Sequence, residues 1–337
     1  MQTFRTVVVG AGGISKPWFE ALKAEQVEVA GVVDIKKENA EARIREFGLA
    51  AEASTELKKT LRRCKPDFVI DLTIPESHGS VTVTALKAGY PVVGEKPMAS
   101  SMAEARKMVK VSLATGKMYM VSQSRRWDSN TATFHQALSS GQIGGVTAVN
   151  CDFYIGAHFG GFRDAMPSPL ILDMAIHHFD LVRYFTGADP VSVYAKEYNP
   201  RGSWYKGDVA ASCIFEMSNG IIFTYRGSWC AEGCHTSWHG NWRVIGDRGT
   251  VLFEQDALPH GQKVTGPNGF FSATAPVEVQ PVTVEKINMH GGLCEMLAFL
   301  RDGKTPQTVC TDNIKSLAMV FSAMESSRKG RPVAITW

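Results

Sequence analysis

The chain has 337 residues, more than one hydrophobic core usually supports, so we expect two domains. Its residues are 44% hydrophobic and 20% charged, as in ordinary globular proteins, and the net charge of +3 is too small to indicate a nucleic-acid or membrane partner. No apolar run reaches the roughly 18 residues of a transmembrane helix, and a strand begins too soon after Met1 for a signal peptide. Seven scattered cysteines favour reduced thiols, so we expect a cytoplasmic protein.

Short apolar strands alternate with helices in the first part of the chain. Strands are expected at 4–10, 27–33, 68–72, 91–93 and 117–121. The helices between them are expected to begin near residues 14, 36, 55, 77 and 102, the last after the capping-box spacing of Ser101 and Glu104. Repeated units of this length predict an α/β Rossmann domain with a doubly wound parallel sheet over residues 1–122.

The pattern changes after residue 122. Helices are expected at about 129–139, 170–186, 290–301 and 312–328, with strands of two-residue alternation between them. The clearest strand is 221–229, which follows the hairpin signal Asn219-Gly220. Residues 123–337 are therefore expected to form an α+β domain with a mostly antiparallel sheet.

A glycine-rich turn, Gly10-x-Gly12-x-x-Ser15, links the first strand to the first helix. Such glycines let a pyrophosphate approach the backbone amides at a helix N-terminus, so Gly10, Gly12, Gly13 and Ile14 are candidates for cofactor binding. The alternative is a glycine turn in a Rossmann-like fold that binds no nucleotide.

Asp34 ends the second strand, where a carboxylate would accept hydrogen bonds from ribose hydroxyls. Its charge would repel a 2′-phosphate, which favours NAD over NADP. Lys36 and Lys37 lie close enough in the sequence to weaken that preference, so NADP stays an alternative.

Lys96 lies in the segment Gly94-Glu95-Lys96-Pro97, at the carboxyl end of a strand. Ligands bind at this end of a doubly wound sheet. Partial burial and a nearby cationic nicotinamide would lower the pKa of the lysine towards acid–base chemistry. The alternative is a solvated surface lysine.

Asp173, His177 and Asp180 recur at helical spacing on one face of the helix expected at 170–186. His178 is rotated by about 100° from that face and is expected to be a packing or surface residue. The alternative for Asp173 and His177 is a satisfied polar pair on a buried helix.

Three segments make the chain resemble the glucose–fructose oxidoreductase/inositol dehydrogenase (Gfo/Idh/MocA) family. They are the glycine loop, the stretch from Thr73-Ile74-Pro75-Glu76-Ser77-His78 to Glu95-Lys96-Pro97, and Leu172-Asp173-Met174-Ala175-Ile176-His177. In that family the first domain binds a nicotinamide dinucleotide and the second presents an open sheet used for oligomerisation. The resemblance therefore implies NAD as cofactor and a homodimer or homotetramer.

The resemblance also implies catalytic roles, in which Lys96, Asp173 and His177 serve the reacting hydroxyl. Two positions depart from the family pattern: Trp18 stands where many members have a histidine, and Ala175 replaces a common glycine. Neither departure removes a catalytic group. The resemblance implies that the dinucleotide is bound beside Thr73, Pro75, His78 and Glu95. It also implies that Arg126 and its neighbour Trp127 lie beside the substrate.

The stretch Cys230-x-x-x-Cys234-His235-x-x-x-His239 holds four potential zinc ligands. Because the chemistry needs no metal and Cys230 is expected to end a strand, we expect no metal there. We expect His235 and His239 instead to face the substrate. Polar–aromatic loops also stack on sugar rings, which makes Tyr198 and Trp204 candidates; the alternative for all four is surface or subunit interface.

These patterns predict an NAD-dependent dehydrogenase that oxidises a hydroxyl of a ring-bearing polyol or sugar. His177 would act as base, Lys96 would polarise the hydroxyl, and Asp173 would orient and balance them. Two alternatives stay open. One is a redox-neutral sugar enzyme with recycled NAD, such as a glycosidase or epimerase with a keto intermediate; the other is a non-enzymatic NAD-binding regulator.

Overall fold

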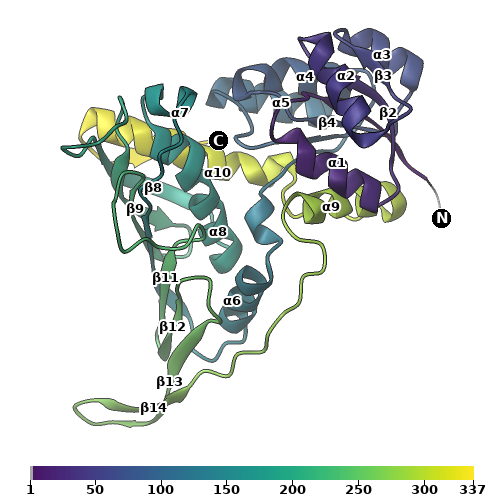
Figure 1. The fold of residues 1–337 in the computed structure, drawn as a ribbon. Helices are drawn as coiled ribbons and strands as arrows, with labels where there is room; N and C mark the ends of the chain where they lie inside the picture. The colour runs from purple at the N-terminus through teal and green to yellow at the C-terminus, as the bar shows by residue number, and fades with distance from the viewer. Residues whose placement is uncertain (1–2) are drawn as a thin grey trace. The chain divides into compact units, whose positions relative to one another are not determined.

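The computed structural model describes residues 3–337, which form two compact units. The first contains residues 3–127 together with Lys286–Ile314, and the second contains Asp128–Glu285 together with Lys315–Trp337. We expected a single division near residue 122. The chain instead returns to the first unit, because helix α9 (Met289–Asp302) packs against α1 (Ser15–Ala24) (Figure 1).

A six-stranded parallel sheet in the order β3-β2-β1-β4-β5-β6 forms the centre of the first unit, which confirms the doubly wound fold. The short edge strand β3 was not predicted, because it has no apolar run. The strands are β1 (Arg5–Val9), β2 (Glu28–Val33), β3 (Glu52–Ser54), β4 (Phe68–Asp71), β5 (Val92–Gly94) and β6 (Tyr119–Val121). The other helices that connect them are α2 (Lys37–Phe47), α3 (Leu57–Cys64), α4 (Pro75–Lys87) and α5 (Met102–Thr115).

Local signals in the sequence account for where these helices begin and end. Ser101 caps α5, and its hydroxyl accepts a hydrogen bond from the backbone N–H of Glu104 at 3.3 Å, as the capping-box spacing predicted. Gly48 ends α2 in the left-handed region at a φ of 61°, where glycine carries no steric cost. Because the strands pair in parallel, their carboxyl ends lie at one edge of the sheet.

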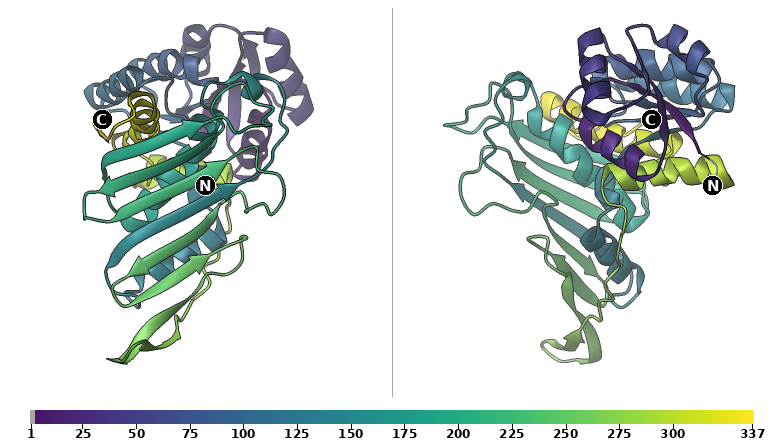
Figure 2. Two further views of the ribbon diagram at one scale, coloured as in Figure 1. Left: turned by 90° about the vertical axis from the view of Figure 1, so that its left-hand side faces the viewer. Right: turned by 45° about the vertical axis from the view of Figure 1, so that its right-hand side comes forward.

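A nine-stranded sheet in the order β14-β13-β12-β11-β7-β10-β9-β8-β15 forms the second unit (Figure 2). Its described neighbours pair antiparallel except β7 with β10, which confirms a mostly antiparallel sheet. The strands are β7 (Val146–Tyr154), β8 (Pro190–Tyr198), β9 (Ala210–Met217), β10 (Ile222–Ser228), β11 (Asn241–Gly246), β12 (Gly249–Phe253), β13 (His260–Asn268), β14 (Ser272–Pro276) and β15 (Val333–Ala334).

Helices cover one face of this sheet. They are α6 (Ser129–Ser139), α8 (Ile176–Thr186) and the part of α10 (Cys310–Lys329) that belongs to the second unit. Along β10, Phe223 and Tyr225 are buried under the helices, whereas Ile222 and Arg226 are exposed on the opposite face. That open face lies towards the viewer in the left view of Figure 2. Within residues 3–337, no helix has the length and apolar character needed to cross a membrane.

Candidate active site

The glycine loop fits the pyrophosphate of a dinucleotide. Gly10 has a φ of 100°, and a Cβ there would lie 2.6 Å from the carbonyl oxygen of Leu72, so only glycine is accommodated. A Cβ on Gly12 or Gly13 would meet nothing within 4 Å, which leaves open space above the loop. The Ser15 hydroxyl donates to the Gly12 carbonyl at 2.7 Å and is fully buried, so it does not obstruct the loop. The loop before α1 thus has the space that an anion at a helix N-terminus requires.

Asp34 is held rigidly at the end of β2. Its Oδ2 accepts from the Ala11 N–H at 2.8 Å, and its Oδ1 accepts from the Lys36 N–H at 2.9 Å. Arg43 in α2 donates to the Gly12 carbonyl at 3.1 Å, which places a guanidinium beside the same loop. Nothing in the local sequence distinguished Arg43 from the other charged residues of α2. The expected ribose site therefore has a carboxylate and a cation on its protein side.

A buried carboxylate braces the backbone of Lys96. Glu95 follows β5, and its Oε1 accepts from the indole N–H of Trp18 at 2.9 Å, while its Oε2 accepts from the Lys96 N–H at 3.1 Å. Burial raises the pKa of Glu95. Trp18, the position that departs from the family pattern, is itself fully buried. The Trp18 substitution is thus accommodated by a hydrogen bond that fixes the segment carrying the half-buried Lys96.

The residues after β4 are organised by Asp71, which the sequence analysis did not single out. Its carboxylate accepts from the hydroxyl of Thr73 at 2.6 Å and from that of Thr82 at 3.0 Å, and lies 3.1 Å from His78 Nδ1. Burial opposes a charge on His78, but the neighbouring carboxylates, Asp71 foremost, together outweigh that effect and the pKa of His78 is raised. His78 lies in the first turns of α4, which Pro75 begins, and is only 1% exposed. Contact of Thr73, Pro75 and His78 with a dinucleotide stays a prediction.

Arg126 and Trp127 face the segment 286–314 of their own unit. The buried Arg126 ends a short 3₁₀ helix, η1 (Ser124–Arg126), and donates to the carbonyl of Gln307 at 3.3 Å. Trp127 packs so tightly on α9 that a Cβ on Gly291 would lie 2.3 Å from its side chain. Trp127 therefore packs within its own unit, and its expected place beside the substrate stays a prediction. A substrate role for Arg126 stays a prediction.

The polar pair of the second unit lies where a π-helical turn meets an α-helix. Asp173 belongs to the π-helical η2 (Leu170–Ala175), and His177 lies in the first turn of α8. The sequence predicted one regular helix over 170–186, which is incorrect for its first six residues; wide turns of this kind are frequent at functional sites. Asp173 Oδ2 accepts from Arg163 Nε at 2.7 Å. His177 is buried, and His178 packs beside Phe153, as expected.

One segment, residues 155–165, collects several of the remaining candidates; we name it the aromatic loop. The ring of His158 stacks on Trp204 with centroids 3.7 Å apart, and the Gly156 N–H donates to His235 Nε2 at 3.2 Å. The same loop carries Arg163, the partner of Asp173, in the short helix α7 (Phe162–Ala165). Sequence reasoning missed His158 and Arg163, although a mixture of glycines and aromatics before a helix is a usable signal.

Tyr198 and His239 have other neighbours. Tyr198 ends β8 with its side chain exposed on the open face of the sheet, together with Tyr194, which is consistent with the interface alternative. His239 Nδ1 lies 2.9 Å from Asp256 Oδ1. Cys234 is exposed and His235 is held by the aromatic loop. The donors of the 230–239 stretch thus have separate surroundings, and the expectation that they bind no metal stays a prediction.

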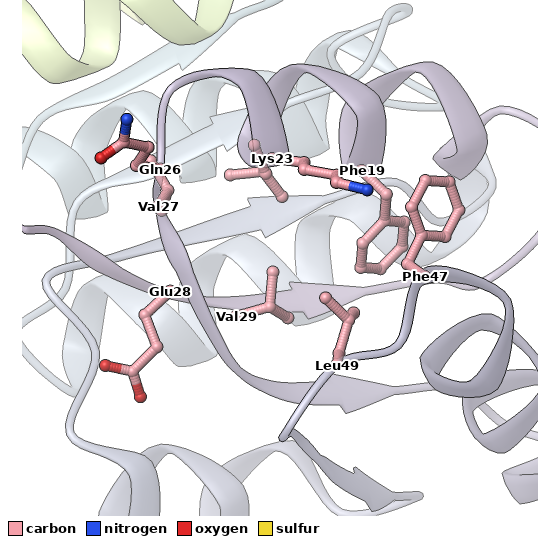
Figure 3. A pocket seen from close by; sticks show the side chains of 9 residues that line it. Phe19, Lys23, Gln26, Val27, Glu28, Val29, Phe47 and Leu49 are labelled. Atoms are coloured by element: carbon pink, nitrogen blue, oxygen red, sulfur yellow. The ribbon is translucent and has the colours of Figure 1, made fainter.

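A cavity of about 300 Å³ lies in the first unit, at the other end of α1 from the glycine loop (Figure 3). It opens beside the start of β2, and its lining is mostly apolar, with Phe19, Val29 and Phe47 among the side chains. Ligands of doubly wound sheets bind at the carboxyl ends of the strands. The cavity is at the amino end of β2, so it is not the site of the chemistry.

Comparison with known proteins agrees with this geometry. Residues 4–123 match the oxidoreductase family with an NAD-binding Rossmann fold, GFO_IDH_MocA, and residues 131–252 match the GFO/IDH/MocA C-terminal domain. The uncharacterized protein y4oX of Sinorhizobium fredii is 27% identical, with 99% of this chain and 96% of the relative covered. D-apiose dehydrogenase of Paraburkholderia graminis is 25% identical, with 99% and 90% covered.

A solved structure shares the whole fold. It is an oxidoreductase from Agrobacterium radiobacter in complex with NAD+, L-tartaric acid and magnesium, with a TM-score of 0.86, 21% identity, and coverage of 99% of this chain and 98% of that one. The fold and the glycine loop define an oxidoreductase with a Rossmann domain for a nicotinamide dinucleotide. The chain belongs to the Gfo/Idh/MocA family.

Proposed function

We propose that this protein oxidises a secondary hydroxyl of a cyclic polyol or sugar with NAD as the acceptor. The observation that carries the proposal is the pairing of two kinds of site in one chain. One unit has a glycine loop open to an anion and a braced Lys96 after β5. The other has Asp173 and His177 at a π-to-α junction, next to an aromatic loop suited to a sugar ring.

The residues of this chain would divide the proton chemistry among them. When bound, the nicotinamide accepts a hydride from the substrate carbon, and this requires that the hydroxyl lose its proton. A histidine titrates near neutral pH without help, so His177 is the base in the direction of oxidation. Lys96 polarises and positions the hydroxyl. Asp173 favours the protonated form of His177, and Arg163 fixes the Asp173 carboxylate as a positioning residue.

Cofactor choice would depend on two charges beside the glycine loop. Asp34 faces a 2′-phosphate with like charge, whereas Arg43 beside Gly12 is a cation that could attract one. Lys37 is paired with Glu41 at 3.4 Å, which offsets its charge. We expect Asp34 to dominate, so that kcat/KM is higher with NAD than with NADP. A higher kcat/KM with NADP would reject this assignment of Asp34, and Arg43→Ala would then show whether the guanidinium is responsible.

The open face of the nine-stranded sheet would join copies of the chain. Tyr194, Ile214 and Ile222 are 46%, 50% and 43% exposed on three neighbouring strands of this face. They therefore form a cluster of exposed apolar side chains, which single surface residues do not. We therefore propose a homodimer or homotetramer through this face. Analytical ultracentrifugation should find the assembly in the wild type, and Ile214→Lys should dissociate it; a wild-type monomer would contradict the proposal.

The test of the function is NADH release from a panel of inositols, aldoses, uronic acids and glycosides, followed by absorbance. Net NADH with a free polyol or sugar is the expected result. Turnover of a substrate without net NADH would favour the redox-neutral enzyme. NAD binding without turnover of any panel member would favour the regulator. His260→Ala, which removes an exposed imidazole from β13, is the matched control for the His177 variants.

A further inference from the structure

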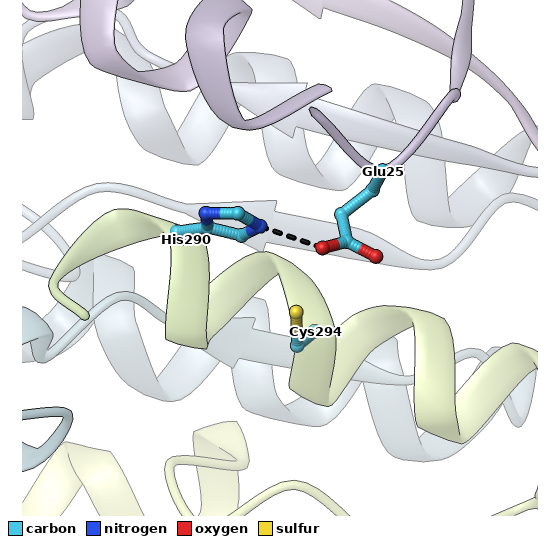
Figure 4. A group of neighbouring side chains, drawn as sticks. All are labelled: Glu25, His290 and Cys294. Carbon is cyan, nitrogen blue, oxygen red and sulfur yellow. Dashed lines mark hydrogen bonds and ion pairs between the residues drawn. The ribbon is translucent and has the colours of Figure 1, made fainter. Parts of the chain in front are cut away.

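Three side chains with metal-ligating atoms converge in the first unit, at the opposite end of α1 from the glycine loop. Glu25 follows the last residue of α1, and His290 and Cys294 lie in the first turns of α9 (Figure 4). One ligand atom of each residue lies within 4.8 Å of the other two. None of the three has a part in the proposed reaction, so the cluster needs its own explanation.

The spacing of the donors suits a metal ion. Cys294 follows His290 by four residues, so both side chains leave the same face of α9. Glu25 Oε1 lies 2.7 Å from His290 Nε2. Ligand atoms around a tetrahedral zinc are about 3.4 Å apart. The Glu25 and His290 ligand atoms would have to move slightly apart, and the Cys294 sulfur would have to move slightly closer to them. All three residues are half-buried, so each is in part accessible to solvent.

The charges at the cluster indicate which positive charge a metal ion would replace beside Glu25. The hydrogen bond from His290, together with Lys286 at 3.2 Å, lowers the pKa of Glu25. Burial raises the pKa of the Cys294 thiol to about 11, with the Glu25 charge acting in the same direction. Lys286 therefore balances the Glu25 carboxylate, and the Cys294 thiol keeps its proton. A divalent cation would supply that positive charge and would release the thiol proton.

We propose that Glu25, His290 and Cys294 form a binding site for a divalent cation of the zinc type. Thiolate, imidazole and carboxylate are the ligand types of zinc, and water would take the fourth position. The ion would cross-link α1, from the beginning of the chain, to α9, from its C-terminal part. Because the thiol must lose a proton and Lys286 competes for Glu25, affinity should rise with pH.

Cobalt(II) is the probe, because thiolate ligation to this ion gives a charge-transfer band in the near ultraviolet that carboxylate and imidazole ligation do not give. Titration of the full-length protein at pH about 8 should raise this band to saturation near one ion per chain, and zinc should then abolish it. A wild-type protein without the band would overturn the proposal.

Three variants locate the ion. Cys294→Ser should remove the band and weaken cobalt binding by more than about 100-fold, since outer-shell partners alone are worth 10- to 100-fold. Cys234→Ser, which changes an exposed thiol of the second unit, should keep the band. Lys286→Ala removes the competing cation and should tighten binding by about 10-fold, a gain that misfolding cannot imitate. A band that survives Cys294→Ser, or one that is lost in Cys234→Ser, would overturn the assignment.

Discussion

The two units place their candidate residues by different means. In the first, the glycine loop, Asp34 and Lys96 each follow the carboxyl end of a parallel strand, so the sheet itself fixes their positions. In the second, Asp173 is positioned by Arg163 from the aromatic loop, and Trp204 is positioned by a ring on that same loop. The candidate residues of the first unit thus depend on the backbone, and those of the second unit depend on contacts between side chains of separate loops.

The largest expected effect tests the chemistry of the second unit. His177→Ala should lower kcat by about 10²- to 10⁴-fold, the usual contribution of a general base, with little change in the dissociation constant of NAD. Steady-state kinetics and a cofactor titration measure the two quantities. His260→Ala should leave both at wild-type values. A wild-type kcat in His177→Ala would mean that another group removes the proton.

A buried carboxylate of the second unit predicts a dependence of stability on pH. Burial raises the pKa of Glu197 from 4.5 to about 7, more than the hydrogen bond from Ser168 lowers it. The folded state thus binds the proton more tightly than the unfolded state. Its contribution to stability is complete below pH 4.5 and is lost as the pH rises through about 7, by up to about 3 kcal/mol.

Glu197→Gln should abolish this dependence and should raise the free energy of unfolding at pH about 8 by up to the same amount, about 3 kcal/mol. Urea denaturation at several pH values measures the effect. Glu216→Gln, on the open face of the neighbouring strand β9, is the control and should keep the wild-type profile. Equal pH profiles for wild type and Glu197→Gln would show that the carboxyl is not held in its protonated form.

Substitutions at two glycines of the first unit should distinguish an effect on stability from an effect on cofactor binding. Gly10→Ala puts a Cβ against the Leu72 carbonyl at a positive φ, so it should destabilise the protein by about 2 kcal/mol. Gly12→Ala meets no atom within 4 Å and should leave stability nearly unchanged, yet it should weaken NAD binding at least about 10-fold, because its methyl occupies the approach of the pyrophosphate. Thermal unfolding measures the stability of the two variants, and titration with NAD measures their cofactor affinity. Unchanged NAD affinity in Gly12→Ala would contradict the assignment of this loop.

The smallest effects concern the loops of the second unit. Trp204→Ala should raise KM for the substrate by about 5-fold, since a stacked ring contributes on the order of 1 kcal/mol, with NAD affinity unchanged. His239 is paired with Asp256, so His239→Ala should change KM less. Steady-state kinetics of the two variants decide the point. A larger effect of His239→Ala would show that the aromatic loop is not the substrate side.

The same difference explains how much could be predicted from the sequence. Gly10, Asp34 and Lys96 were found because a strand end and a motif coincide within a few residues. The Trp18–Glu95 hydrogen bond joins residues 77 positions apart, and the Arg163–Asp173 pair depends on how a loop folds back. The return of α9 to the first unit gave no local signal either, because the amphipathic pattern of a helix does not specify its partner. Side-chain partners across long separations follow from packing, which a local pattern does not encode.

The central proposal is that Lys96 and His177 serve the same hydroxyl proton. A double-mutant cycle on kcat, with Lys96→Ala, His177→Ala and the combined variant, tests it most directly. Groups that act as a unit give non-additive losses, so the combined variant should lose about as much as the worse single variant. Losses that multiply, or a near-wild-type kcat in Lys96→Ala, would contradict the account.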